Sequence, residues 1–232
     1  MFRSTNVFLY TVTAMMVLAC ASFAASTSPS KISVDQDFID FGYVPFDFNV
    51  VHIYTIYNTG KGDLILHKFV PNCDCTSVYP SDTLIKPGDS TEIKLMMGTE
   101  QYYGPNTRHV AVHSNDPVDS VILLEFHSNI GSYPKQFRIN PISLFFLPGH
   151  TSKTVNLANF SGDDVDYKVI LEKDSLLTVS PMNGEIETDK PTVLTITPKA
   201  DIPRGTHETN LTILYDTDDK TKITIPVKIV RY

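Results

Sequence analysis

The sequence contains one pattern twice, and the second copy follows the first by 101 residues. At this constant offset, residues of the same kind correspond: Asn58 and Asn159, Gly104 and Gly205, Ile93 and Leu194, Leu95 and Ile196, Val110 and Leu211, Val112 and Ile213. A single offset that holds over so many positions indicates a duplicated structural unit. A unit of about 100 residues has the size of one small domain, so we expect two similar domains in tandem.

Within each copy, apolar and polar residues alternate, which is the pattern of β-strands. The alternation is clear in residues 52–57, 91–95, 109–113, 192–196 and 223–230. Turns with Gly, Pro and Asn separate these runs, and we find no helical periodicity after the N-terminal segment. Many short strands in a repeat of this length are typical of an immunoglobulin-like sandwich. We expect an all-β chain with immunoglobulin-like β-sandwich domains at 31–130 and 136–232, linked by 128–135.

The N-terminal segment has the build of a secretory signal peptide. Arg3 precedes an apolar run from Val7 to Ala19, and small and polar residues follow. The run is shorter than the roughly 20 apolar residues of a membrane span. We expect residues 1–25 to be removed during export, which places the mature chain in the periplasm or cell envelope.

Two cleavage sites compete in this segment. Residues 22–24 (Ser-Phe-Ala) offer the small residues that a signal peptidase reads, whereas residues 17–20 (Val-Leu-Ala-Cys) are similar to the lipobox of bacterial lipoproteins. In the first case Cys20 is discarded, and in the second it carries lipid and anchors the chain. The imperfect fit of Leu18 to a lipobox favours the first. Either way, Cys20 cannot pair with another cysteine.

Composition limits what the exported part can do. The full sequence has 42% hydrophobic and 19% charged residues, which is typical of a globular chain that can bury a core. A net charge of −7 without any run of Lys or Arg argues against a nucleic-acid partner. The sequence has no G-x-S-x-G, no H-E-x-x-H and no nucleotide-binding fingerprint, so we predict neither an enzyme nor a cofactor.

Four short motifs of the first copy resemble a known bacterial family. They are Asn58-Thr-Gly, Cys73-Asp-Cys-Thr, Lys86-Pro-Gly-Asp and His113-Ser-Asn-Asp-Pro. In this order they are similar to the domain-of-unknown-function family 1573, although Asp74 stands where that family usually has Gly. The resemblance covers residues 34–130 and implies an immunoglobulin-like sandwich related to the abnormal-spindle/hydin and major sperm protein domains. It implies no catalytic activity. The second copy lacks the cysteines and resembles the fold only.

Cys73 and Cys75 occur in the first copy alone, where the second has Asp174 and Leu176. Four roles are open: a disulfide between them, a Zn or Cu(I) site with His67 as a third ligand, a thiol-redox pair, or two inert packed thiols. Residues 72–78 look extended, and in an extended chain the Cα atoms of i and i+2 lie about 6.5–7 Å apart, at or beyond the limit of a disulfide. We therefore predict that both remain free thiols.

Binding is the leading hypothesis for function. The predicted loop 97–106 contains adjacent Tyr102 and Tyr103, and exposed tyrosines anchor many protein interfaces. We expect an exported binding or structural module that uses these tyrosines to contact another exported or cell-envelope protein. The competing interpretation is an aromatic lid on the first sandwich. The alternative function is periplasmic redox or Cu/Zn binding at Cys73 and Cys75.

Overall fold

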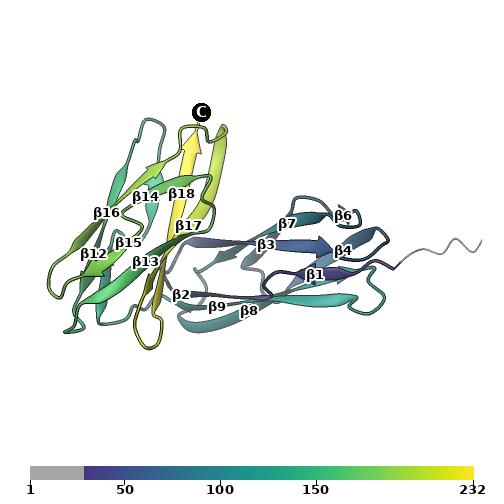
Figure 1. The fold of residues 1–232 in the computed structure, drawn as a ribbon, viewed down its shortest axis with the longest axis horizontal. Coiled ribbons are helices and arrows are strands. Elements are labelled where there is room, and N and C mark those ends of the chain that lie inside the picture. The colour runs from purple at the N-terminus through teal and green to yellow at the C-terminus, as the bar shows by residue number, and fades with distance from the viewer. Residues whose placement is uncertain (1–28) are drawn as a thin grey trace, which may run out of the picture.

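The computed structural model describes residues 29–232, and its regular elements are all β-strands (Figure 1). The predicted all-β fold class is therefore confirmed. The signal segment 1–25 and Cys20 lie outside the described residues, so export and lipidation stay predictions. Within the described range, no helix is long and apolar enough to cross a membrane.

The first domain is a sandwich of two sheets around one apolar core. Tyr54, Leu124 and Phe126 lie in this core, each at most 2% exposed. One sheet contains, in spatial order, β1 (Ile32–Val34), β3 (Asn49–Asn58), β7 (Ser90–Gly98) and β5 (Thr76–Pro80). The other contains β2 (Phe38–Val44), β9 (Val121–Ile130), β8 (Gly104–Ser114), β4 (Leu64–Pro71) and β6 (Leu84–Ile85).

The second domain is a sandwich with its own core, in which the ring of Phe137 stacks on that of Tyr215 at 4.0 Å between centroids. One sheet contains β10 (Phe137–Asn140), β12 (Lys153–Asn159), β16 (Thr192–Pro198) and β14 (Leu177–Ser180). The other contains β15 (Asn183–Ile186), β13 (Val165–Leu171), β17 (Gly205–Tyr215) and β18 (Lys222–Arg231), and β11 (Leu144–Phe146) runs parallel to β18.

The duplication predicted from the sequence recurs in the strands and in their register. β17 and β18 begin and end 101 positions after β8 and β9. Val110 lies opposite Leu124 in the first domain, and Leu211 lies opposite Ile225 in the second. All four side chains are buried, because each stands at an inward position of an alternating strand. The period-two pattern thus builds the same pair of strands twice.

A buried asparagine closes the same turn in each domain. Asn58 Nδ2 donates to the backbone carbonyl oxygens of Gly62 and Ile85, at 2.8 and 2.9 Å. Asn159 Nδ2 makes the corresponding two bonds in the second domain, at 2.7 and 3.0 Å. Because buried polar groups need partners, this side chain holds the turn after β3 against β6, and the turn after β12 against β15.

The second domain covers an open strand edge of the first. β1 pairs with β3 only at residues 56–58, so the earlier residues of that edge pair with no other described strand. There the Val51 N–H donates to Asn210 Oδ1, and the Ile53 N–H donates to Glu172 Oε1, both at 2.8 Å. Side chains of one domain therefore satisfy backbone donors of the other, which fixes the junction and protects the edge.

The two domains also share a sheet. β18 lies parallel to β2, with Ile223 opposite Tyr43, and this pairing merges one sheet of each sandwich into a single sheet. The contact is close because Gly42 has no side chain: a Cβ there would collide with the backbone of Lys222. Figure 1 shows the result, in which the second sandwich stands across the end of the first.

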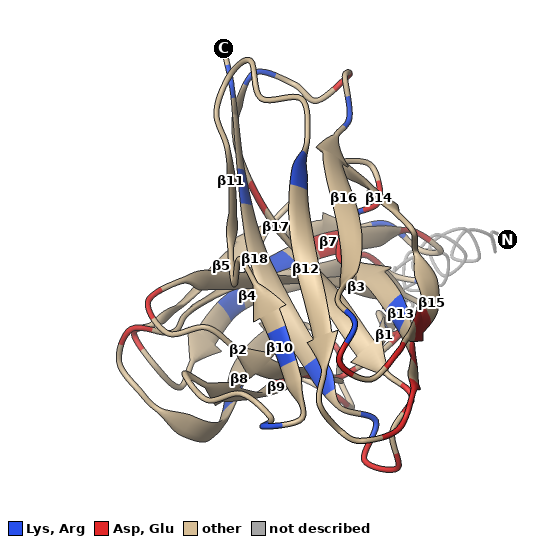
Figure 2. Ribbon diagram, turned by 90° about the vertical axis from the view of Figure 1, so that its left-hand side faces the viewer, with Lys and Arg blue, Asp and Glu red and all other residues tan. Residues whose placement is uncertain are grey.

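Charged residues are dispersed over this framework. In Figure 2 the Lys and Arg residues stand apart on different strands and loops, and Asp and Glu lie in loops of both domains. This view shows no continuous basic stripe of the kind that binds a phosphate backbone.

We expect Asn159→Ala to lower the free energy of unfolding of the second domain by about 2–3 kcal/mol, because two backbone carbonyls lose their donor. Urea unfolding would measure the loss. Asn156 is a matched control, because it lies exposed on the same strand, and Asn156→Ala should change stability by less than about 0.5 kcal/mol. Equal losses in the two variants would contradict the role given to Asn159.

Candidate functional site

The Ser-Asn-Asp-Pro motif of the first domain is a structural turn. The buried carboxylate of Asp116 accepts hydrogen bonds from the N–H groups of Ile32, Val118 and Asp119, at 2.7, 2.8 and 3.0 Å. Burial disfavours the charge of Asp116, but these donors outweigh it and hold the pKa of the carboxyl below its usual value. The motif ties β1 to the turn between β8 and β9.

The Asn-Thr-Gly and Pro-Gly motifs are bonded to each other. The Gly88 N–H donates to the carbonyl oxygen of Asn58 at 2.9 Å, and the Asn58 N–H donates to that of Asp89 at 2.9 Å. Gly88 has φ +83°, a left-handed conformation that favours glycine. These two motifs therefore also serve the fold. Of the four motifs, only Cys-x-Cys-Thr contains side chains with reactive chemistry.

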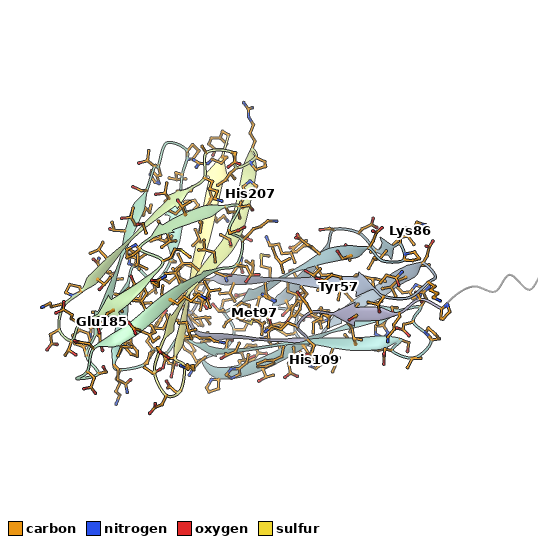
Figure 3. All side chains as sticks on the ribbon, viewed as in Figure 1. Tyr57, Lys86, Met97, His109, Glu185 and His207 are labelled. Atoms are coloured by element: carbon orange, nitrogen blue, oxygen red, sulfur yellow. A yellow bond between two sulfur atoms is a disulfide. The ribbon has the colours of Figure 1, made fainter. Side chains whose placement is uncertain are left out.

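Cys73 and Cys75 stand where the chain crosses from one sheet of the sandwich to the other. β4 pairs with β8 in one sheet, and β5 pairs with β7 in the opposite sheet, so residues 72–75 must turn. The Thr76 N–H closes this turn by donating to the carbonyl oxygen of Cys73 at 3.1 Å. Met97 lies opposite Thr76, and Figure 3 places Met97 at the end of the first domain that is near the second. The crossing therefore lies at this end of the first domain.

The two cysteines form a disulfide, with their Cα atoms 5.2 Å apart. The prediction of free thiols is therefore wrong. It assumed an extended chain from Asn72, whereas β5 begins only at Thr76 and the turn before it shortens the distance into the range that a disulfide spans. The need to cross between sheets, which a local pattern does not reveal, is the physical reason.

The second domain makes the same crossing without cysteines. In the first domain the Gly98 N–H donates to the carbonyl oxygen of Cys75 at 2.8 Å. At the corresponding place in the second, the Lys199 N–H donates to that of Leu176 at 3.0 Å. The crossing therefore does not require the disulfide, which is a feature added to one copy of the fold.

A buried arginine lies against the disulfide. Arg108 is 3% exposed, and its Nη1 donates to Cys75 Sγ. The ring of Tyr102 covers the guanidinium, with the Arg108 Cζ 4.6 Å from the ring centroid. Burial lowers the pKa of Arg108, while Tyr102 and Glu100 act in the opposite direction.

Arg108 lacks the partners that a buried cation usually has. Across residues 29–232, its Nε and Nη2 atoms have no hydrogen-bond partner, and no carboxylate forms an ion pair with it. Sequence reasoning missed this residue. The signal was present, because Arg108 stands in phase with the buried Val110 and Val112 on β8 and is thus a charge at an inward position.

His67 does not join the cysteines in a metal centre. In the described part of the chain, no three His, Cys, Asp or Glu side chains are grouped to hold a metal ion. His67 is an exposed residue of β4, and the sulfurs of Cys73 and Cys75 are bonded to each other rather than available as thiolate ligands. The arrangement predicted for a Zn or Cu(I) site is therefore not the one in this structure.

Tyr102 and Tyr103 have different surroundings. Tyr102 is 46% exposed and covers Arg108, whereas Tyr103 is 70% exposed and stacks on the ring of Phe46 at 4.2 Å between centroids. Tyr103 also lies over Gly131, where a Cβ would collide with its ring. Tyr102 thus resembles a lid, and Tyr103 is an exposed ring held in one orientation.

Two grooves flank the junction between the domains. One has a volume of about 370 Å³ and is lined from both domains, by residues that include Asp47, Phe48, Phe145, Glu208 and Lys228. The other has a volume of about 430 Å³, and its lining includes Val51, Lys94, Glu172, Ile202 and His207. Phe46, on which Tyr103 stacks, is adjacent in sequence to the first groove.

Residues 32–130 match the family described as "Protein of unknown function (DUF1573)". The match spans the first domain. The resemblance read from the four motifs is therefore confirmed, and three of these motifs in this DUF1573 domain prove to be structural turns. A comparison with curated proteins found no match.

Several solved structures are similar in fold. A protein of unknown function from Porphyromonas gingivalis W83 is 14% identical, with a TM-score of 0.37, over 86% of this chain and 99% of that one. WR4, an MSP family member of C. elegans, is 16% identical, with a TM-score of 0.36, over 42% of this chain and 100% of that one. The CsuC–CsuE chaperone–tip adhesion subunit complex of Acinetobacter baumannii is 16% identical, with a TM-score of 0.38, over 41% of this chain and 56% of that chain. All three TM-scores are below 0.5, so these likenesses carry no argument about this chain.

We expect neither Cys73 nor Cys75 to react with iodoacetamide when the protein is unfolded without reductant, because the turn brings them within bonding distance. Mass spectrometry should find their peptide unlabelled and two hydrogens lighter than its reduced form. After reduction, both should be labelled. In the control variant Cys75→Ser, Cys73 should be labelled at once. Labelling of both cysteines in the unreduced protein would contradict the disulfide.

Proposed function

We propose that this protein is an exported, non-enzymatic module that binds another protein of the cell envelope at the junction of its two domains. The observation that carries the proposal is Tyr103, which is 70% exposed although its ring is held by the stack on Phe46. An exposed ring in a fixed orientation loses little conformational entropy on binding, which is what an interface anchor needs.

The junction gives this anchor a rigid base. The backbone donors of Val51 and Ile53 are satisfied by Asn210 and Glu172 of the second domain. Separating the domains would exchange these two hydrogen bonds for bonds to water, a net loss of about 0.5–1.5 kcal/mol for each bond and more where the acceptor is the Glu172 carboxylate. The two sandwiches therefore present one composite surface rather than two independent ones.

The groove that begins at Asp47, the residue after Phe46, has the composition of a protein interface. This groove combines the rings of Phe48 and Phe145 with charges of both signs, Glu208 and Lys228. An aromatic centre with a polar and charged rim is typical of protein-binding surfaces. Export to the envelope rests on the signal peptide predicted for residues 1–25 and completes the proposal.

The binding role is tested with the variant Tyr103→Ala. The mature chain, immobilised, should retain a protein from a cell-envelope extract, and Tyr103→Ala should weaken that binding about tenfold or more, as loss of an interface anchor does. The melting temperature should stay unchanged. Tyr57, which Figure 3 places away from the junction, is the matched control, and Tyr57→Ala should bind like the unmodified protein.

Two outcomes would contradict this function. If Tyr103→Ala binds normally and only melts earlier, the ring is a structural lid. If Tyr57→Ala and Tyr103→Ala weaken binding equally, the contact is not at the junction.

A further inference from the structure

The disulfide beside Arg108 has no part in the binding function. We propose that the Cys73–Cys75 disulfide exchanges with dithiols, that the attacking thiolate meets Cys73, and that Cys75 leaves as a thiolate paired with Arg108. Three observations support this assignment. Cys73 and Cys75 differ in exposure, Arg108 forms no ion pair within residues 29–232, and the second domain has neither the cysteines nor the arginine at the corresponding positions.

The two cysteines differ in access. Cys75 is 9% exposed, whereas Cys73 is partly exposed and the neighbouring Asp74 is exposed. The rate of thiol–disulfide exchange depends on which sulfur an attacking thiolate can reach. Attack therefore falls on Cys73, and the buried Cys75 becomes the leaving group.

The leaving sulfur meets a cation. Arg108 is buried, and its Nη1 contacts Cys75 Sγ, which is neutral in the disulfide. A buried guanidinium whose hydrogen-bond partner is a neutral sulfur has lost hydration, and the ring of Tyr102 and the charge of Glu100 offset that loss only in part, since burial still lowers the pKa of Arg108. A thiolate on Cys75 would supply the missing opposite charge, and a stabilised leaving thiolate departs faster.

Other charged and titratable groups surround this pair. Glu100 acts on Arg108 electrostatically, and Asp74 lies between the two cysteines, so both carboxylates oppose a new negative charge. The ring of Tyr102 covers the guanidinium and keeps it from water. Of these groups, only Arg108 forms a hydrogen bond with Cys75 Sγ in the part of the chain that the structure describes.

The second domain shows that the fold forms without the disulfide and the buried arginine. Asp174, Leu176 and Thr209 stand there at the places of Cys73, Cys75 and Arg108. That domain forms the same strands and the same crossing, so neither the disulfide nor the buried arginine is needed to build the sandwich. The first domain carries the reactive sulfurs and the cation together, and the second carries none of the three.

The exchange takes place in two steps. The thiolate of a dithiol bonds to the Cys73 sulfur, and the Cys73–Cys75 bond breaks with its electron pair on Cys75. The second thiol of the dithiol then loses its proton and attacks the dithiol sulfur that is now bonded to Cys73. Cys73 leaves as a thiolate and takes up a proton. The dithiol, which enters with one thiol already deprotonated, is oxidised to a disulfide by two electrons, and the protein disulfide gains them; the proton of the second thiol is balanced by the one that Cys73 takes up, while Cys75 stays a thiolate.

Reduction by dithiothreitol, a small dithiol, tests the role of Arg108. We expect Arg108→Met to slow the reduction about tenfold, because the leaving thiolate loses its cation. Arg108→Lys keeps the positive charge and should stay within about threefold of the unmodified protein. The rate is followed by quenching with iodoacetamide and counting labelled cysteines by mass. Equal rates for Arg108→Met and the unmodified protein would overturn the proposal.

A second measurement holds even if Arg108→Met does not fold. Cys73→Ser leaves Cys75 alone beside Arg108, and Cys75→Ser leaves Cys73 alone at the surface. At neutral pH, Cys73→Ser should show the ultraviolet absorbance of a thiolate and Cys75→Ser should not. A thiolate signal from Cys75→Ser, or none from Cys73→Ser, would overturn the assignment of Cys75 as the leaving group.

Discussion

The arrangement of this molecule depends on one open edge of β3. β1 covers only the last part of that edge, and Asn210 and Glu172 of the second domain accept hydrogen bonds from the remaining donors at Val51 and Ile53. Because buried N–H groups are rarely left unpaired, these contacts hold the second sandwich against the first. At the same junction, β2 and β18 join one sheet of each sandwich, and a groove lies on either side of the junction.

The two domains show what the fold needs and what one copy adds to it. Both use a buried asparagine to close the same turn, and both cross between sheets at the same place. In the second domain the crossing packs Leu176, while in the first it carries a disulfide next to a buried Arg108. Packing suffices for stability in one copy, so the polar and reactive version in the other calls for a chemical explanation.

The binding surface and the disulfide share one short loop. Residues 99–103 connect β7 to β8, and Tyr102 in this loop covers Arg108 while Tyr103 stacks on Phe46. A protein that contacts Tyr103 would therefore approach the cover of the disulfide site. Conversely, a charge that forms on Cys75 would act on the guanidinium beneath Tyr102. The two proposed activities are thus physically adjacent, although each stands on separate observations.

The sequence alone determined the all-β class, the duplication and the DUF1573 character of the first domain. Alternation is a local property, and a constant offset of 101 residues carries strands and register from one copy to the next, as β8 and β17 demonstrate. The sequence also singled out Cys73, Cys75 and the two tyrosines. Only the tertiary structure decided their states: the sheet-to-sheet crossing turned residues 72–75 and joined the cysteines, and left His67 outside any metal cluster of the described residues. It also placed Arg108 against Cys75 and the second domain against β3. These contacts join residues that are distant in the sequence, and a pattern read over neighbouring positions has no information about which distant side chains will meet.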